Sequence, residues 1–313
     1  MPKVFITGHR GMVGSALVRA VEKNCPTLTL LLADRKHLDL LDQTSVEQFL
    51  SDEKPDYIIN AAARVGGIHA NSTYPAEFIH QNLTLNANLI HSAWKIGVSR
   101  FLNLGSSCIY PCRSEQPIKE EYLLTGRLEK TNEAYALAKI AGLEMCRHYR
   151  MQYGVLFHSA MPTNMYGPGD NYHPEDSHVL PALIRRFHEA KLNDLSEVVI
   201  WGTGSPRREL MHVDDLAAGV LFLLENGNPP DWVNLGTGID HSIQEIANLV
   251  KEVVGYKGTI SNDTSKPDGM PLKRLDVSLA ERMGWKAKIS LDEGLRATYK
   301  DFCDSLASNT ARL

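Results

Sequence analysis

Residues 3–14, which read Lys3-Val-Phe-Ile-Thr-Gly-His-Arg-Gly-Met-Val-Gly14, decide the fold of this chain. The first five form an apolar run typical of a buried strand, and apolar residues then recur at helical spacing as far as Asn24. Glycines at such a junction let a phosphate approach backbone N–H groups at a helix N-terminus. A plain tight turn would need fewer of them. We therefore predict a dinucleotide site here, with contacts from Gly8, His9, Arg10, Gly11, Met12, Val13 and Gly14.

Strand and helix patterns alternate along the first half of the chain. Strands are expected at 27–33, 56–60, 101–105 and 155–160, with helices at 43–51, 75–97 and 135–153. This β-α-β order is typical of a parallel sheet. After Pro168 the alternation stops, and helices are expected at 179–190, 213–224, 245–254, 278–283 and 291–302, with strands at 198–201 and 232–235.

We predict an α/β fold: a doubly wound Rossmann-type parallel sheet of about seven strands with a smaller mixed α/β C-terminal substrate lobe. The dinucleotide-binding domain is expected at 1–168 and is completed by about 196–240. The substrate-binding lobe is expected at 169–195 and 241–313.

Composition excludes several classes of protein. The chain has 313 residues, with 33 Lys and Arg against 37 Asp and Glu, so it lacks the basic character of a nucleic-acid-binding protein. No apolar run approaches the ~18 residues that a membrane span needs, and the N-terminus does not resemble a signal peptide. The five cysteines have no metal-ligand CxxC spacing. We expect a cytoplasmic enzyme with no bound metal, no nucleic-acid partner and no membrane segment.

The residues after the second expected strand bear on the choice of dinucleotide. Asp34 occupies the position where an acidic residue would bond the ribose 2′-OH of NAD. Arg10 and Arg35 instead suit a ribose 2′-phosphate, because guanidinium groups match phosphate oxygens. We favour NADP(H), although Asp34 would repel that phosphate unless it turns away. Asp39 and Leu40 follow where an adenine edge would lie.

A second group of residues indicates hydride-transfer chemistry. Tyr135 and Lys139 are four residues apart on an expected helix and so share a face. A nearby cation lowers the pKa of a tyrosine and makes it a usable acid–base group. Ser106, on the turn after an expected strand, would bond the same substrate oxygen. A surface helix pair is the alternative for the Tyr and Lys alone.

Several motifs, taken together, resemble the extended short-chain dehydrogenase/reductase family, and within it the branch of GDP-4-keto-6-deoxy-D-mannose 3,5-epimerase-4-reductases. The resemblance covers nearly the whole chain. It rests on the glycine turn and on Ala63-Arg-Val-Gly-Gly-Ile68, Gly105-Ser-Ser-Cys-Ile-Tyr-Pro111, Tyr135 with Lys139, Met161-Pro-Thr-Asn-Met-Tyr-Gly-Pro168, Asn171-Tyr-His173, His178, His212-Val-Asp-Asp215 and Lys266-Pro-Asp-Gly269.

The resemblance implies a homodimer that acts on GDP-4-keto-6-deoxy-D-mannose, epimerises carbons 3 and 5 and reduces the 4-keto group with NADPH. Cys108 and His178 would move the protons, beside the catalytic residues Ser106, Tyr135 and Lys139. The further cofactor contacts that it implies are Ala61, Ala63, Leu104, Pro162, Asn164, Met165 and His178. The substrate contacts would be Val179, Arg186, Trp201, Arg208, Asp268 and Lys273.

Simpler roles exist for some of these residues. Cys108 alone would fit an inert buried thiol, His178 a helix-start residue, Arg186 a solvated helix face and Asp268 an ordinary turn. Cys112 is expected to be a bystander. A plain 4-reductase or 4-epimerase of another nucleotide sugar is the alternative function. A catalytically silent NADP-binding regulator is the alternative from another class.

Overall fold

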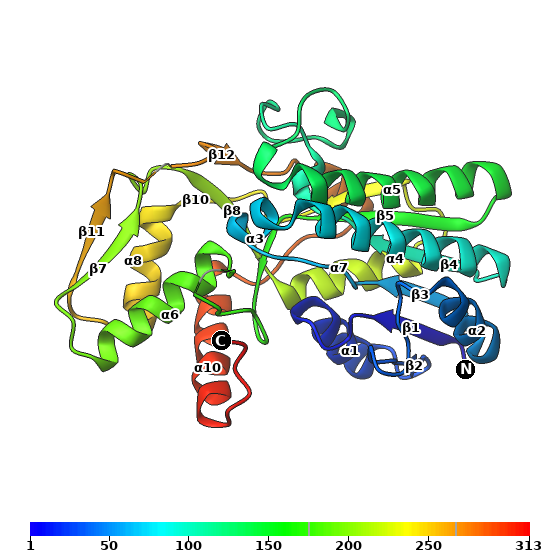
Figure 1. Cartoon of the computed structure of the whole chain (residues 1–313), viewed down its shortest axis with the longest axis horizontal. Helices are drawn as coiled ribbons and strands as arrows, with labels where there is room; N and C mark the ends of the chain where they lie inside the picture. Colours follow the sequence, from blue (N-terminus) through cyan, green and yellow to red (C-terminus); the bar gives the residue numbers. More distant parts are fainter. Residues whose placement is uncertain (175, 267) are drawn as a thin grey trace.

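The central sheet of the computed structural model is parallel, and in the described residues (1–174, 176–266 and 268–313) it has six strands in the order β2-β1-β3-β4-β5-β9 (Figure 1). The winding reverses between β1 and β3, so a crevice for ligands is expected at the carboxyl ends of these strands. The strands are β1 (Lys3–Thr7), β2 (Thr29–Leu31), β3 (Tyr57–Asn60), β4 (Arg100–Leu104), β5 (Leu156–Pro162) and β9 (Trp232–Leu235).

Helices cover both faces of this sheet (Figure 1). One face carries α1 (Met12–Asn24) and α7 (Val213–Glu225), and the other carries α2 (Gln43–Glu53), α4 (Pro75–Lys95) and α5 (Glu133–Tyr153). Successive strand residues point to opposite faces, so Val4 and Ile6 pack with α1 and α7 whereas Phe5 packs with α2 and α4. This explains why a parallel strand is apolar at consecutive positions.

A second core is built mainly from the C-terminal half of the chain. The helices α6 (Val179–Leu192), α8 (Ile243–Val254) and α10 (Leu291–Ala307) surround it. Its strands are β7 (Glu197–Trp201) paired with β11 (Thr259–Asp263), and β8 (Arg207–His212) paired with β6 (Asn164–Tyr166), β10 (Asp240–Ser242) and β12 (Leu272–Lys273). Short helices complete the chain: α3 (Ile68–Thr73), α9 (Ser278–Met283), η1 (Ser107–Ile109), η2 (Glu120–Tyr122) and η3 (Lys130–Asn132).

The predicted fold class is confirmed, but the expectation of about seven strands is wrong for the described sheet. The strand at β7 pairs with β11 and does not join the central sheet. Within 196–240, α7 packs on that sheet and β9 is its edge strand, whereas β8 pairs with β6, β10 and β12. The strands β6, β10 and β12 have only two or three residues, too few to show a periodicity. The boundaries of the two lobes stay a prediction.

Glu209 on β8 is a fully buried carboxylate that joins distant segments of the chain. Its Oε1 accepts hydrogen bonds from the N–H groups of Thr237 (2.7 Å) and Gly238 (2.8 Å), and its Oε2 accepts from that of Leu275 (2.7 Å). Burial raises the pKa of Glu209, while these backbone donors oppose the shift. The carboxylate therefore fixes the turn after β9 and the segment after β12 against β8.

Glu209→Gln is expected to lower the free energy of unfolding by about 1–3 kcal/mol. The amide would turn its NH₂ group toward a backbone donor and leave that donor unsatisfied. Urea unfolding would measure the loss, with Glu197→Gln on the exposed start of β7 as the matched control. Equal stability of the two variants would contradict the role given to Glu209.

Candidate functional site

The glycine turn packs β1 tightly against the start of α1. Gly8 has a φ of +66°, in the left-handed region that favours glycine. A Cβ atom at Gly14 would lie 2.1 Å from the Gly8 carbonyl oxygen. Both positions therefore require glycine for close approach of backbone to backbone.

The start of α1 fits an anionic ligand. The helix begins after Gly11, no side chain caps it, and its first turn has no acidic residue. The first N–H groups of a helix have no partner within the helix, and the helix dipole favours negative charge there. This end of α1 therefore suits the diphosphate of a dinucleotide.

The other predicted cofactor residues follow the carboxyl ends of several strands. Leu104 ends β4, and Pro162 ends β5. Arg35 and Asp39 are exposed, whereas Leu40 is half-buried in the core under α2. Ala61 and Ala63 come directly after β3, and Asn164 and Met165 lie in β6. The topology thus brings these segments to one edge of the sheet, and their contacts with the cofactor stay a prediction.

Lys139 and Tyr135 form one unit on α5. Lys139 is 4% exposed, and its Nζ donates a hydrogen bond of 2.7 Å to the Leu104 carbonyl. The same Nζ lies 5.7 Å from the centroid of the Tyr135 ring. Burial lowers the pKa of Lys139 to about 8 and raises the pKa of Tyr135. The phenol therefore keeps its proton at neutral pH with a cation close by.

Ser106 and Cys108 occupy the turn that follows β4. The Ser106 Oγ caps η1 by accepting a hydrogen bond from the Cys108 N–H at 3.4 Å. The Cys108 thiol is free and 8% exposed. Burial raises its pKa, but the charge of Lys273, the hydrogen bond with Ser106 and the charge of Lys139 all oppose this shift. Cys108 also interacts electrostatically with Tyr135, so the turn faces the start of α5.

His178, also predicted to move a proton, is linked to this cluster through Lys273. His178 immediately precedes α6. The segment before it is fixed by a hydrogen bond of 3.0 Å that the Gly67 N–H donates to the Asp176 carbonyl oxygen. The His178 residue is exposed at the surface of the chain. Partial desolvation by the protein around its ring and, next, the positive charge of Lys273 lower the pKa of His178. Lys273 therefore acts electrostatically on both His178 and Cys108. From the sequence, Lys273 was expected only as a substrate contact.

Trp201 forms an aromatic platform with two cations on it. The side chain is exposed, and its ring centroid lies 5.4 Å from the Arg186 Cζ and 5.5 Å from the Lys266 Nζ. An aromatic face beside cations suits a base joined to a diphosphate. Lys266 was not among the predicted site residues, and Pro267 of the same motif lies outside the described residues. Val179, at the start of α6, is partly exposed.

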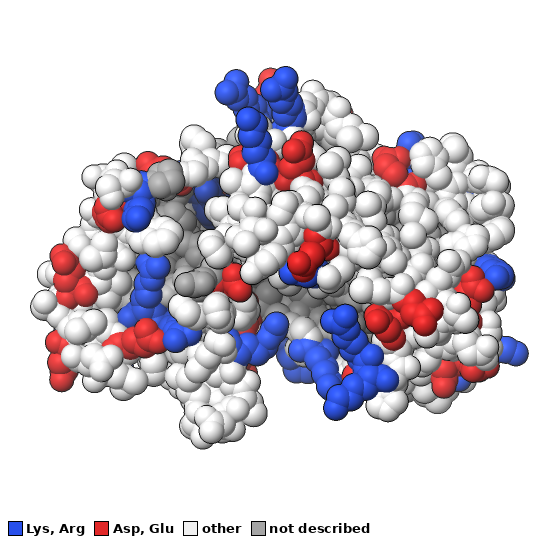
Figure 2. Space-filling model, viewed as in Figure 1, with Lys and Arg blue, Asp and Glu red and all other residues white. Residues whose placement is uncertain are grey.

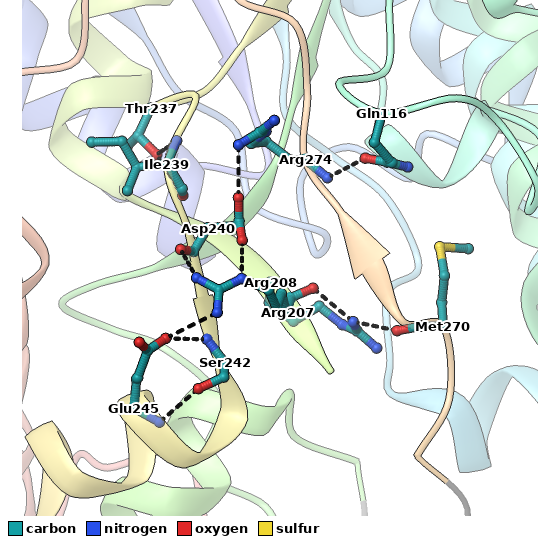
Figure 3. A network of polar contacts seen from close by, with 10 residues as sticks. All are labelled: Gln116, Arg207, Arg208, Thr237, Ile239, Asp240, Ser242, Glu245, Met270 and Arg274. Carbon is teal, nitrogen blue, oxygen red and sulfur yellow. Dashed lines mark hydrogen bonds and ion pairs between the residues drawn. The ribbon is translucent and has the colours of Figure 1, made fainter. Parts of the chain in front are cut away.

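A polar network fixes the strands that carry Arg208 and Lys273 (Figure 3). The Arg208 Nη1 donates to the carbonyls of Met270 (2.6 Å) and Arg207 (2.8 Å), and burial lowers the pKa of Arg208. Nearby, the largely buried Asp240 carboxylate pairs with both Arg207 and Arg274. These contacts tie β8 to β10 and β12, and they hold Arg208 in register with Lys273.

Asp268 has a structural role in the described chain. Its carboxylate accepts hydrogen bonds from the Thr203 N–H (2.6 Å) and the Thr203 hydroxyl (2.9 Å). A Cβ at Gly202 would lie 2.3 Å from its Oδ1, so the turn needs glycine at that position. Asp268 therefore shapes the turn after Trp201, and a direct contact with a substrate stays a prediction.

The described residues contain no group of three or more His, Cys, Asp or Glu side chains that could hold a metal ion. Within the same part of the chain, every helix is too short or too polar to cross a membrane. All five cysteines are free thiols.

Comparison with known proteins establishes the family. The model of the NAD dependent epimerase/dehydratase family matches residues 4–236, and the chain belongs to this family. It is 56% identical over 297 residues to GDP-L-fucose synthase 1 of Arabidopsis thaliana, covering 95% of this chain and 92% of that protein. It is 50% identical over 312 residues to GDP-L-fucose synthase of Escherichia coli (strain K12), covering 97% of each.

A solved structure extends the comparison to three dimensions. The crystal structure of a GDP-L-fucose synthetase from Naegleria fowleri bound to NADP has a TM-score of 0.91 and 27% sequence identity to this chain. The match covers 100% of this chain and 96% of that one. The resemblance to the extended short-chain dehydrogenase/reductases is thereby confirmed.

Proposed function

We propose that this chain converts GDP-4-keto-6-deoxy-D-mannose to GDP-L-fucose, with NADPH as the reductant. The reaction epimerises carbons 3 and 5 and then reduces the 4-keto group, so the protein is both an epimerase and an oxidoreductase. The names of its relatives, at 50–56% identity, and the NADP-bound neighbour support this activity and this cofactor.

The observation that carries the proposal is the grouping of two proton-transfer residues with a reductase site. Cys108 interacts electrostatically with Tyr135, Lys139 and Lys273, and Lys273 also acts on His178. A plain reductase needs no such pair of acid–base groups next to the tyrosine.

In the epimerisation, the chain's residues remove a proton from a carbon beside the 4-keto group and return one to the opposite face. Loss of that proton places negative charge on the 4-oxygen, where Ser106 and Tyr135 donate hydrogen bonds. Cys108 and His178 exchange the protons, one acting as base and the other as acid. Lys273 opposes the effect of burial on Cys108 and so favours its thiolate, the form that accepts a proton from carbon.

In the reduction, Tyr135 gives its proton to the 4-oxygen. When bound, NADPH supplies the hydride for carbon 4. Lys139, buried beside the phenol, stabilises the tyrosinate that remains. Ser106 keeps the oxygen in place during the transfer, so a single pair of donors serves both reactions.

The alternatives make different predictions about the same residues. In a plain 4-reductase or 4-epimerase, Cys108 and His178 would be structural and no hydrogen would exchange at carbons 3 and 5. A silent NADP-binding regulator would have no turnover at all. The cluster of Ser106, Cys108, Tyr135, Lys139 and His178 favours the bifunctional enzyme over both.

Incubation with GDP-4-keto-6-deoxy-D-mannose and NADPH in deuterium oxide tests the proposal directly. NMR of the purified nucleotide sugar should show GDP-L-fucose with deuterium at carbons 3 and 5. An unlabelled D-sugar would identify a plain reductase. No consumption of NADPH would exclude this substrate for the chain.

The reduction rate is expected to fall as the pH rises above about 8. Burial lowers the pKa of Lys139 to about 8, so the ammonium carries its charge below that pH and loses it above. Without the cation the tyrosinate is not stabilised, and the rate should drop about tenfold per pH unit on the alkaline limb. NADPH oxidation measured across this range at saturating cofactor checks the expectation. A rate that stays constant to pH ~10, the ordinary lysine range, would contradict the charge effect.

We further propose that the protein is a homodimer. The neighbouring helices α4 and α5 expose the apolar side chains Leu83, Leu137, Met151 and Tyr153. Exposed apolar side chains on two adjacent helices favour association, and a second copy would cover part of them with the same two helices. Light scattering should give about twice the 34.8 kDa mass of one chain. The mass of a single chain would contradict this.

Five free thiols fit a reducing compartment, and we place the enzyme in the cytoplasm on this basis. Fractionation of cells that produce the protein would test this. Recovery of the activity in the exported fraction would contradict it.

A further inference from the structure

Two loops meet at the carboxyl edge of β1 and β2, and Asp34 lies where they contact each other. Arg10 comes from the glycine turn after β1, whereas Asp34 and His37 come from the segment after β2. Figure 2 shows Lys and Arg side chains gathered over the region where α1 and β2 lie in Figure 1. This is the edge at which the ribose of the adenosine half is expected.

Both oxygens of the Asp34 carboxylate are engaged within the protein. The Asp34 Oδ2 accepts a hydrogen bond of 2.9 Å from the Arg10 guanidinium. Its Oδ1 lies 2.6 Å from the His37 Nδ1 and also accepts from the N–H groups of Lys36 (3.1 Å) and His37 (3.3 Å). A carboxylate only accepts, so the His37 Nδ1 is the atom that carries the proton. The hydrogen bond from His37 and the charges of His37 and Arg10 hold the pKa of Asp34 below its usual value.

Exposure distinguishes the carboxylate from its partners. The Asp34 side chain is 15% exposed, whereas those of Arg10 and His37 are 74% and 78% exposed. A ligand that approaches this edge therefore meets a guanidinium and an imidazole before it meets the acid. A ribose 2′-phosphate would be attracted to such a surface, whereas a ribose hydroxyl would find the carboxylate already occupied.

We propose that His37 is a cofactor-specificity residue: by holding Asp34 against Arg10, it turns an acid suited to NAD into part of a site for the ribose 2′-phosphate of NADPH. The inference rests on the proposed use of NADPH. Asp34 then holds the Arg10 guanidinium and the His37 imidazole in place. Without the His37 imidazole, the Asp34 Oδ1 loses its shortest contact and keeps only two backbone N–H donors, so the carboxylate can accept a hydrogen bond from a ribose hydroxyl and repels a phosphate more strongly.

Isothermal titration calorimetry with 2′,5′-ADP and 5′-ADP tests this inference without turnover. The wild type should bind 2′,5′-ADP more tightly than 5′-ADP. His37→Ala should reduce that preference about fivefold, the range expected for an exposed ion pair. In an Asp34→Asn background the same substitution should change the preference by less than about twofold, because the carboxylate no longer needs neutralising.

His148→Ala is the matched control, because His148 is an exposed histidine that pairs with Glu144 near the far end of α5. Equal weakening of both nucleotides by His37→Ala, or an undiminished effect in the Asp34→Asn background, would overturn the inference. So would a wild type that binds the two nucleotides equally. The deuterium experiment on the wild type reports separately on the proposed function, so either conclusion can fail while the other stands.

Discussion

Tyr135→Phe is expected to slow NADPH oxidation by about 10²–10⁴-fold with GDP-4-keto-6-deoxy-D-mannose as substrate. The variant keeps the ring and its edge-to-face contact with Phe78, but it removes the proton that the 4-oxygen must receive. Hydride transfer without protonation would leave an alkoxide that only Ser106 stabilises. The fall in NADPH absorbance measures this rate directly.

The same variant should retain proton exchange at carbons 3 and 5, because Cys108 and His178 are unchanged. The exchange should be slower than in the wild type, since one of the two donors to the enolate oxygen is lost. Tyr149→Phe is the control, as Tyr149 lies on the same helix and bonds His91 away from the cluster. Undiminished NADPH oxidation in Tyr135→Phe would refute the role of the phenol as proton donor.

Features set by neighbours in the sequence could be predicted before the structure. The glycine turn is one such feature, because its conformation depends on residues within one loop. Gly8 and Gly14, which this conformation requires, can be read directly from the sequence. The pairing of Tyr135 with Lys139 is another, because helical spacing fixes which residues share a face. Long helices such as α5 were also predicted to within a few residues.

Features set by distant residues could not be predicted in this way. The donors to Glu209 lie 28 to 66 residues further along the chain, and a single glutamate in a polar strand gives no signal of them. Lys273 was expected only as a substrate contact, because nothing in the neighbouring sequence indicates its interaction with Cys108. His37 lies in an ordinary polar loop, and only the pairing of β1 with β2 brings it and Asp34 to the loop of Arg10.

Cys108→Ser is expected to abolish most of the epimerisation while hydride transfer continues. A serine hydroxyl has a much higher pKa than a thiol, so it cannot accept a proton from carbon at neutral pH, and the loss should be about 10²–10⁴-fold. Serine is similar in size to cysteine and fills the same buried site. The intact Ser106, Tyr135 and Lys139 should then reduce the unepimerised ketone to a GDP-6-deoxy-D-sugar.

Deuterium NMR of the product separates this outcome from a loss of folding. Continued NADPH oxidation with little deuterium at carbons 3 and 5 would show that the reductase site is intact and that only the proton transfer has failed. Cys112→Ser is the matched control, since this free thiol lies four residues further on and is not part of the electrostatic cluster around Lys273. Normal deuterium incorporation in Cys108→Ser would rule out the thiol as an acid–base group and leave His178 to be paired with another residue.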